Sequence, residues 1–401
     1  MRIGTLFVAA AALLASLTAS QAETAVKIGV LNDQSSLYKD LSGEGAVVAA
    51  KMAIEDFNAA AKGIKVEVVS ADHQNKPDIA VNKAREWYDQ DGVDAIFDVP
   101  NSGVALAISA LTKEKNKVFI DSGAATSDLT GAKCSPNTIH WTYDTWELAH
   151  GTGSATVKAG GTTWFFLTAD YAFGQALERD TAAVVIAEGG KVLGGVRVPL
   201  NTQDFSSYLL QAQSSGAKVV GLANAGGDTI NSIKQASEFG IVAGGQKLAG
   251  LLVFLTDVHS LGLKTAQGLV LTSPFYWDLN DGTRAFAARF MKATGRMPTM
   301  VVAGVYSGVL HYLKGVQAAG SAKDPLAVIA KMKELPAEDP LFGKSTVRAD
   351  GRVIHDSYLF EVKKPEESKG PWDYYKLIST TPAEKAFRPM SEGGCPLVAG
   401  K

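Results

Sequence analysis

Two short loops of this 401-residue chain carry residue types that suit the binding of an anion. Ser102, in the stretch 99–103, begins a predicted helix, where unpaired backbone N–H groups and the helix dipole favour negative charge. The stretch 122–126 sets Ala124 and Ala125 among other small residues, so that a ligand can approach the backbone N–H groups closely. Together the two loops predict a cradle for a carboxylate. The alternative for Ser102 is that its hydroxyl only caps the helix.

Aromatic and acidic side chains follow other predicted strands and would form the walls of the same site. In an open parallel sheet, ligands gather at the carboxyl ends of the strands, so residues just after a strand are the candidates. The predicted wall residues are Tyr38, Tyr171, Asp228, Phe254, Tyr276 and Trp277. An aromatic side chain in such a position can instead belong to the hydrophobic core, but its recurrence along one edge favours a binding site.

The chain lacks the motifs of the common enzyme and metal sites. Gly343-Lys344-Ser345 resembles the end of a phosphate-binding loop, but Glu338 stands where that loop requires glycine. No GxGxxG motif follows the first predicted strand, and the sequence contains no GxSxG, HExxH or CxxC motif. The six histidines are scattered. We therefore expect a binding protein rather than an enzyme, with no catalytic residue, no cofactor and no metal.

The elements that position these residues alternate short β-branched runs with longer Ala-rich helical runs, which predicts an α/β fold with parallel sheets. The first set has predicted strands 26–31, 66–70, 95–99 and 118–121, with helices 44–60, 78–88 and 104–113. The second set has strands 164–168, 191–198, 219–222, 248–254 and 269–272, with helices 174–188, 205–214 and 228–239. Helices 283–294, 300–319 and 325–334 follow, and then extended segments with a predicted hairpin turn at Asp350-Gly351.

The N-terminus has the layout of a cleavable secretory signal. Arg2 precedes an apolar run at 5–17, and small residues Ser20 and Ala22 stand at the −3 and −1 positions of a cut. The run is shorter than the roughly 20 residues that span a bilayer, which disfavours a membrane anchor. We expect residues 1–22 to be a signal peptide and the protein to be periplasmic and not membrane-spanning. With a formal net charge of −2, nothing in the sequence resembles a basic nucleic-acid-binding surface, and no nucleic-acid partner is expected.

The chain has two cysteines, Cys134 and Cys395. In an exported protein such a pair favours one disulfide, here between a loop and the C-terminal tail. The alternative is two free thiols.

Several stretches, in this order and over nearly the whole chain after residue 22, resemble type I periplasmic binding proteins of the leucine/isoleucine/valine-binding class. They are Val26-Lys27-Ile28-Gly29-Val30-Leu31, Asn101-Ser102-Gly103, Ala124-Ala125-Thr126, Asp170-Tyr171-Ala172-Phe173-Gly174, Asp204-Phe205-Ser206 and Asp350-Gly351-Arg352. The resemblance implies two Rossmann-like lobes with parallel sheets, joined by a three-crossing hinge that closes on a ligand in the cleft. It divides the chain into lobe 1, residues 24–143 plus 274–350, and lobe 2, residues 144–273 plus 351–401.

The resemblance also implies roles for single residues. Ser102 and the backbone of Ala124 and Ala125 match the carboxylate-binding loops. Tyr38 matches a first-lobe wall residue, and Tyr171 matches a second-lobe residue that closes on the ligand.

Two ligand classes remain open. Amino-acid binders of this class hold the ligand ammonium with an acid after a second-lobe strand, whereas 251–255 has none before Asp257. A branched-chain or other aliphatic amino acid would therefore need Asp228 or Asp257 as its partner. An aromatic acid would need no such partner and would be walled by Tyr171, Phe254, Tyr276 and Trp277.

By this resemblance the chain is the extracytoplasmic solute-binding component of an ABC importer, a monomer whose partners are a small carboxylate ligand and a transporter permease. The alternatives are a ligand-binding subunit of a sensory receptor system and, with less support, an exported enzyme.

Overall fold

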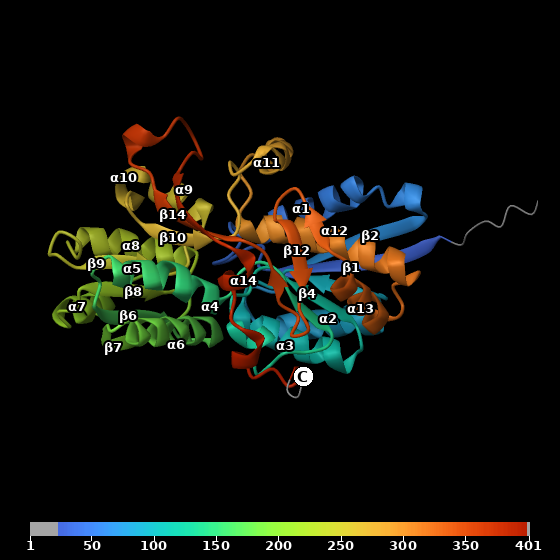
Figure 1. Cartoon of the computed structure of the whole chain (residues 1–401), viewed down its shortest axis with the longest axis horizontal. Coiled ribbons are helices and arrows are strands. Elements are labelled where there is room, and N and C mark those ends of the chain that lie inside the picture. The colour runs from blue at the N-terminus through green and yellow to red at the C-terminus, as the bar shows by residue number, and fades with distance from the viewer. Residues whose placement is uncertain (1–22, 399–401) are drawn as a thin grey trace, which may run out of the picture.

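The computed structural model describes residues 23–398, so the predicted signal peptide lies outside the described residues. Two lobes lie side by side along the long axis of the molecule, each built on its own parallel sheet (Figure 1). The predicted two-lobed α/β fold is confirmed. No helix within residues 23–398 has the length and apolar character needed to cross a membrane.

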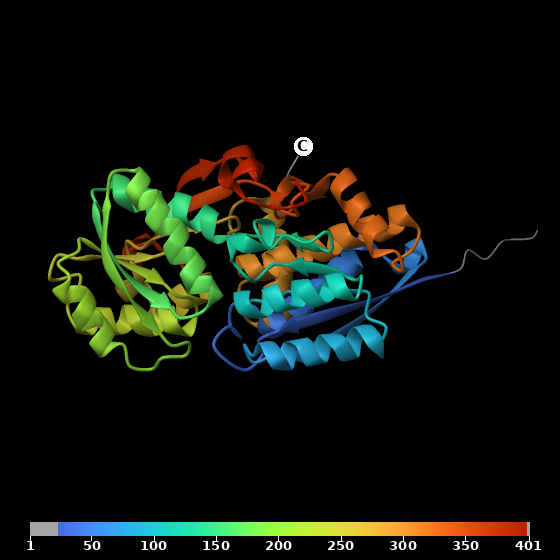
Figure 2. The same cartoon turned by 90° about the horizontal axis from the view of Figure 1, so that it is seen from below.

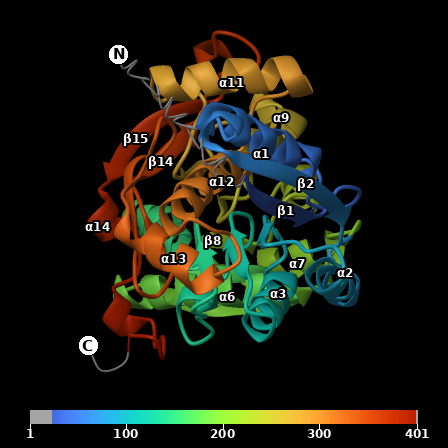
Figure 3. The ribbon, with the colours of Figure 1, turned by 90° about the vertical axis from the view of Figure 1, so that its right-hand side faces the viewer.

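The first lobe contains a five-stranded sheet in the order β2-β1-β3-β4-β5, in which every pair is parallel. Its strands are β1 (Thr24–Asn32), β2 (Ile64–Asp72), β3 (Ala95–Phe97), β4 (Val118–Asp121) and β5 (Thr138–His140). The helices that pack with them are α1 (Gly43–Phe57), α2 (Pro77–Asp89), α3 (Ser102–Glu114), α11 (Asp281–Thr294), α12 (Met300–Ala319) and α13 (Pro325–Glu334). Both faces of this sheet are covered by helices (Figure 3).

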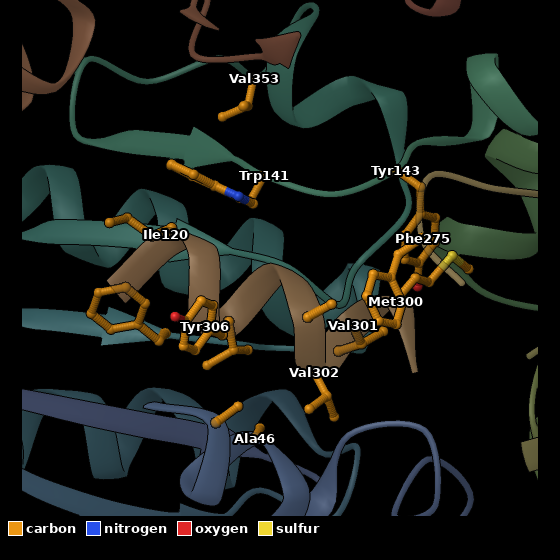
Figure 4. Packing of buried hydrophobic residues seen from close by; sticks show 14 of the residues in the cluster. Ala46, Ile120, Trp141, Tyr143, Phe275, Met300, Val301, Val302, Tyr306 and Val353 are labelled. Carbon is orange, nitrogen blue, oxygen red and sulfur yellow. The ribbon is translucent and has the colours of Figure 1, made fainter. Parts of the chain in front are cut away.

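Alternation along these strands explains the two covered faces, because successive side chains of a strand point to opposite sides. Phe97 and Ile120 belong to the core cluster that contains α1 and α12. Their neighbours Ile96 and Phe119 belong to the cluster on the other face, which contains α2 and α3. Figure 4 shows the first of these cores, where Val302 and Tyr306 of α12 lie between the sheet and α1.

The second lobe contains a four-stranded parallel sheet in the order β7-β6-β8-β9. Its strands are β6 (Thr163–Ala169), β7 (Lys191–Val198), β8 (Val219–Ala223) and β9 (Lys247–Gly250). Its helices are α4 (Thr145–Leu148), α5 (Ser154–Lys158), α6 (Ala172–Ala187), α7 (Ser206–Ser214), α8 (Gly227–Glu238), α9 (Leu255–Leu261) and α10 (Leu263–Ala266). The prediction of strand 248–254 was wrong at its end, because the chain leaves the sheet after Gly250 and Phe254 is the N-cap residue of α9.

Two small antiparallel sheets complete the fold and depart from the parallel pattern that the sequence predicted. They comprise β10 (Val270–Ser273), β14 (Ser357–Val362) and β15 (Tyr375–Thr381) in one sheet, and β11 (Ala337–Asp339), β12 (Gly343–Val347) and β13 (Val353–Ile354) in the other. The hairpin turn at Asp350-Gly351 is confirmed, since β12 and β13 pair across it. Gly351 has φ 86°, and a Cβ there would lie 2.5 Å from the carbonyl oxygen of Thr138. The last short helix, α14 (Ala383–Ala386), follows β15.

The C-terminal segment (red) lies along the junction between the lobes (Figure 2). The predicted Cys134–Cys395 disulfide is confirmed and fastens the tail to a loop of the first lobe. Beneath the tail, the fully buried Arg352 donates hydrogen bonds to the carbonyl oxygens of Trp141, Thr142 and Tyr143, which follow β5. A charged side chain therefore holds together the chain segments at this junction.

A closed aromatic cleft between the lobes

The carboxyl ends of strands from both lobes face one another across a small cleft. The cavity volume left between its side chains is about 10 Å³, about the space that one water molecule needs, so the lining residues nearly fill the cleft in this form. Apolar and aromatic residues dominate the lining, which consists of Tyr38, Leu41, Pro100, Gly123, Ala125, Tyr143, Tyr171, Phe173, Ala225, Leu252 and Phe254. Each of these residues follows the end of a parallel strand, or lies at the start of the helix after it.

The two lobes touch directly at the cleft. The hydroxyl groups of Tyr38, from the first lobe, and Tyr171, from the second, are 2.5 Å apart and share a hydrogen bond. Tyr38 is only 2% exposed, and burial raises the pKa of both phenols, so both stay protonated. A Cβ on Gly226 would lie 2.8 Å from the carbonyl oxygen of Leu37, so the backbones of the two lobes also meet here. The structure is therefore a closed form.

Among residues 23–398, no charged side chain lines the cleft. Asp228, near the start of α8, is 2% exposed and interacts electrostatically with both Tyr38 and Tyr171. Its Oδ2 accepts a hydrogen bond from the N–H of Asn201 at 3.1 Å, whereas its Oδ1 has no partner in the described chain. Burial raises the pKa of Asp228 to about 7.

Ser102 lies one layer behind the cleft lining, and the cap of its helix comes from its neighbour. The Oδ1 of Asn101 accepts hydrogen bonds from the N–H groups of Gly103 and Val104 at 3.0 and 3.1 Å, so the alternative that Ser102 caps α3 was wrong. The Ser102 Oγ accepts a hydrogen bond from the N–H of Thr126 at 3.2 Å. Its own proton remains for another acceptor.

The loop after β4 presents backbone groups at the cleft. Ala125 is part of the lining. Ala124 is behind it, because its N–H donates weakly to the Oδ1 of Asp121 at 3.4 Å and its carbonyl oxygen accepts from the Nε2 of His140 at 2.6 Å. Of the two predicted alanines, only Ala125 reaches the ligand space.

Phe254 lines the cleft as predicted, and its backbone N–H donates to the Oδ2 of Asp257 at 2.9 Å. Asp257 thus caps α9, and burial raises its pKa to about 7. Tyr276 and Trp277 lie elsewhere. The Tyr276 hydroxyl and the Trp277 Nε1 both donate to the carbonyl oxygen of Trp372, at 3.1 and 2.8 Å, and so fasten the segment before β15.

Sequence reasoning missed several lining residues. Pro100, Gly123, Phe173 and Ala225 stand in the loops that were singled out, but nothing in the residue types separated them from their neighbours. Tyr143 gave no signal, because it follows β5, a strand of three residues that the sequence pattern did not predict. Leu41 and Leu252 complete this set. Among the described residues, no group of three or more His, Cys, Asp or Glu is placed to hold a metal ion.

Comparison with known proteins decides the family. A family model described as periplasmic binding protein matches residues 25–371. The chain belongs to this family. Family membership makes it a solute-binding protein rather than an enzyme, and it confirms the resemblance drawn from the sequence.

Solved structures similar to this periplasmic binding protein come from several bacteria. A periplasmic binding protein of Burkholderia mallei is 54% identical, with a TM-score of 0.91 over 94% of this chain and 99% of that one. A branched chain amino acid ABC transporter periplasmic ligand-binding protein of Burkholderia xenovorans is 45% identical, with a TM-score of 0.82 over 93% and 99%. A solute binding protein of an ABC transporter from Rhodopseudomonas palustris, in complex with p-hydroxybenzoic acid, is 25% identical, with a TM-score of 0.78 over 90% and 97%.

Proposed function

We propose that this periplasmic binding protein is the extracytoplasmic solute-binding component of an ABC importer and that it closes around a small aromatic carboxylate. The observation that carries the ligand class is the cleft lining, which is apolar and aromatic on both sides and has no charged side chain. The solute binding protein in complex with p-hydroxybenzoic acid shares the fold, which supports this ligand class.

The aromatic walls suit a flat ring. Tyr143 and Phe254 have ring centroids 6.0 Å apart with planes at 71°, an edge-to-face arrangement at the boundary of the two lobes. A ligand ring beside them gains the hydrophobic effect and favourable ring-edge contacts. An ammonium group here would meet no charged partner in the lining, and burying an unpaired charge is costly.

The carboxylate of the ligand is assigned to the first-lobe side. The Ser102 hydroxyl has a free proton, and the Ala125 N–H has no hydrogen-bond partner within residues 23–398. Both belong to loops that begin or precede helical turns, where backbone donors favour an anion. These two donors would orient the ligand, and the closing lobe would cover its ring with Tyr171 and Phe254.

One observation favours the second candidate ligand, a branched-chain or other aliphatic amino acid. The Oδ1 of Asp228 is buried without a partner in the described chain, and this carboxylate interacts electrostatically with Tyr38 and Tyr171, so it could pair with an ammonium. The relative from Burkholderia xenovorans carries a branched-chain amino acid name. In that case the ammonium would have to displace the contact between the two tyrosines.

The same proposal places the division of the lobes at 24–143 plus 274–350 and 144–273 plus 351–401. The packing of α12 on α1 and the pairing of β14 with β10 support it. The protein would act in the periplasm as a monomer with a transporter permease as partner. A sensory receptor subunit is the alternative, which genes for a permease and an ATPase beside this one would disfavour.

A thermal-shift panel tests the ligand class, with benzoate and 4-hydroxybenzoate against L-leucine, L-isoleucine and acetate. A ligand at 100 times its Kd adds about 2.7 kcal/mol of stability, so the proposal predicts a clear rise in Tm with the aromatic acids. A rise with leucine or isoleucine alone would replace it by the amino-acid alternative. No rise with any compound would contradict both.

Variants of the cleft sharpen this test. Ser102→Ala and Phe254→Ala should weaken benzoate binding, the first by removing a donor and the second by removing a wall. Ser207→Ala, on the exposed surface of α7, is the matched control and should bind as the parent does. Unchanged affinity in Ser102→Ala would remove Ser102 from the site.

A further inference from the structure

Two buried aspartates lie side by side beneath the first-lobe wall of the cleft. Asp121 ends β4 and Asp98 follows β3, and the parallel register that pairs Phe97 with Ile120 makes them neighbours. Both are 0% exposed. A Cβ on Gly123, a residue of the cleft lining, would lie 2.7 Å from the Oδ1 of Asp98. One carboxylate is therefore directly under the surface that the ligand would touch.

In each of these carboxylates, only one of the two oxygens accepts hydrogen bonds from described residues. The Oδ2 of Asp98 accepts hydrogen bonds from the Ser42 Oγ at 2.6 Å and the Asn32 Nδ2 at 3.3 Å. The Oδ1 of Asp121 accepts from the backbone N–H of Val99 at 3.1 Å. The second oxygens, Asp98 Oδ1 and Asp121 Oδ2, are buried and have no partner in the part of the chain that the structure describes.

No cation balances the pair. None of the ion pairs between described residues involves either aspartate. The groups that donate to the pair are the Ser42 hydroxyl, the Asn32 amide and backbone N–H groups, all of them uncharged. The Tyr143 hydroxyl interacts electrostatically with both aspartates but donates its hydrogen bond to the carbonyl oxygen of Gly123. Two ionised carboxylates in such a place repel each other, and unpaired buried charge is costly.

The titration of the two groups agrees with this geometry. Burial raises the pKa of Asp98 to about 6, although hydrogen bonds from Ser42 and Asn32 lower it. Burial also raises the pKa of Asp121 well above its ordinary range, and the charge of Asp98 adds to that rise.

We propose that Asp98 and Asp121 hold a shared proton beneath the cleft and that capture of an anionic ligand is coupled to uptake of a further proton by this pair. A single proton held by either carboxylate leaves the pair with one negative charge. A ligand carboxylate at the Ser102 and Ala125 donors lies close to that charge, so binding favours the neutral form of the pair. The pair thus determines how strongly the cleft accepts an anion.

The proposal rests on the proposed function only through the negative charge of the ligand. It predicts that the affinity for a charged ligand depends on pH. Because ligand binding and proton binding are linked, affinity for an anion is highest at low pH and falls as pH rises. The limit is about tenfold per pH unit when one proton is taken up for each ligand bound. A neutral analogue of the same shape, benzamide, should show no such dependence.

The experiment is calorimetric titration of the full protein with benzoate at about pH 7 in two buffers of different ionisation enthalpy, repeated between about pH 5.5 and 8.5. The expected result is net proton uptake and weaker binding at higher pH. In Asp98→Asn and Asp121→Asn both effects should shrink, because asparagine keeps an acceptor oxygen for the existing donors but cannot take up a proton. Benzamide is the control ligand.

Two further variants separate this pair from other buried acids. Asp339→Asn removes a partly buried lobe-1 carboxylate whose pKa is raised by burial and that is outside the cleft lining, and it should leave the proton uptake unchanged. Asp228 lies near the cleft and has a pKa of about 7, so Asp228→Asn is the rival. Proton uptake that disappears in Asp228→Asn but persists in Asp98→Asn and Asp121→Asn would overturn the proposal. So would benzoate binding with no proton uptake and no pH dependence.

An infrared measurement on the ligand-free protein keeps the two proposals separate. Near neutral pH the parent should show bands of protonated buried carboxyl groups, to which Glu147, Asp228 and Asp257 also contribute. The band of the pair is therefore the one that the parent shows and that is lost in the chain carrying both Asp98→Asn and Asp121→Asn. If benzoate does not bind but this band is present and lost in the variant, the ligand proposal fails while the shared proton stands. Absence of the band from the parent would contradict the shared proton. If Asp121→Asn does not fold, Asp98→Asn alone carries both measurements.

Discussion

The hydrogen bond between Tyr38 and Tyr171 joins the two lobes, so its removal by Tyr171→Phe tests how the lobes close on a ligand. The two hydroxyls are 2.5 Å apart and link opposite lobes. The substitution keeps the ring that walls the cleft and deletes only the hydroxyl. Because the lost contact exists in the closed form alone, it should destabilise the ligand-holding state without unfolding either lobe.

The free-energy cost of losing this hydrogen bond follows from the burial of Tyr38, which is 2% exposed. Deleting its partner leaves a buried phenol without a hydrogen bond, at a cost of about 1–3 kcal/mol. If closure is required for tight binding, ligand affinity should fall by about 5- to 150-fold. Replacing both tyrosines by phenylalanine should cost less than Tyr171→Phe alone, since no polar group is then stranded.

The assay is a double-mutant cycle on the Kd of the best ligand from the thermal-shift panel, with small-angle scattering to report closure. Tyr208→Phe, on α7 and outside the cleft, is the control and should leave Kd unchanged. Equal effects for Tyr171→Phe and for the double variant would refute the argument from the stranded hydroxyl. A Kd unchanged in Tyr171→Phe would refute the role of the contact in closure.

Three further results are expected. Arg352→Met should lower the free energy of unfolding by about 3–5 kcal/mol in urea melts. The substitution leaves the buried carboxylate of Asp144, 3.6 Å from the guanidinium, and several carbonyl oxygens without their cationic partner. An unchanged urea midpoint would contradict this prediction. Burial raises the pKa of Glu147 from its ordinary 4.5 to about 8, so the folded protein binds more protons than the unfolded chain between these values and stability falls as pH rises. Glu147→Gln should flatten that fall in melts across this range, and an unaltered slope would count against it. Replacing Cys134 and Cys395 by serine should cost about 2–5 kcal/mol relative to the disulfide-bonded parent, measured by thermal unfolding. The reduced parent should match the variant, and a variant as stable as the disulfide-bonded parent would contradict the prediction.

Strand-end reasoning from the sequence found Tyr38, Ala125, Tyr171 and Phe254, because a parallel sheet gathers the residues after its strands at one edge. The helices and most parallel strands could also be predicted from the sequence, since each has a local hydrophobic pattern. Tyr276 and Trp277 were assigned to the cleft by the same reasoning, but β10 pairs with β14, far along the chain, and that pairing leads both side chains to Trp372. A non-local pairing has no local signal.

The rest of the site depends on contacts that cannot be predicted from residue types alone. The unpartnered oxygens of Asp98 and Asp121 follow from the register of β3 and β4 and from the turn after Asp121. The free proton of Ser102 follows from the cap that Asn101 supplies. Both features became visible only once the side chains were placed in three dimensions.

A crystal structure of the protein grown with benzoate would show whether the cleft holds an aromatic carboxylate. We expect one benzoate in the cleft, with its ring beside Tyr143 and Phe254 and its carboxylate within hydrogen-bond distance of the Ser102 hydroxyl or the Ala125 N–H. A benzoate bound only outside this cleft, or an empty cleft in crystals where an amino acid instead pairs with Asp228, would contradict it.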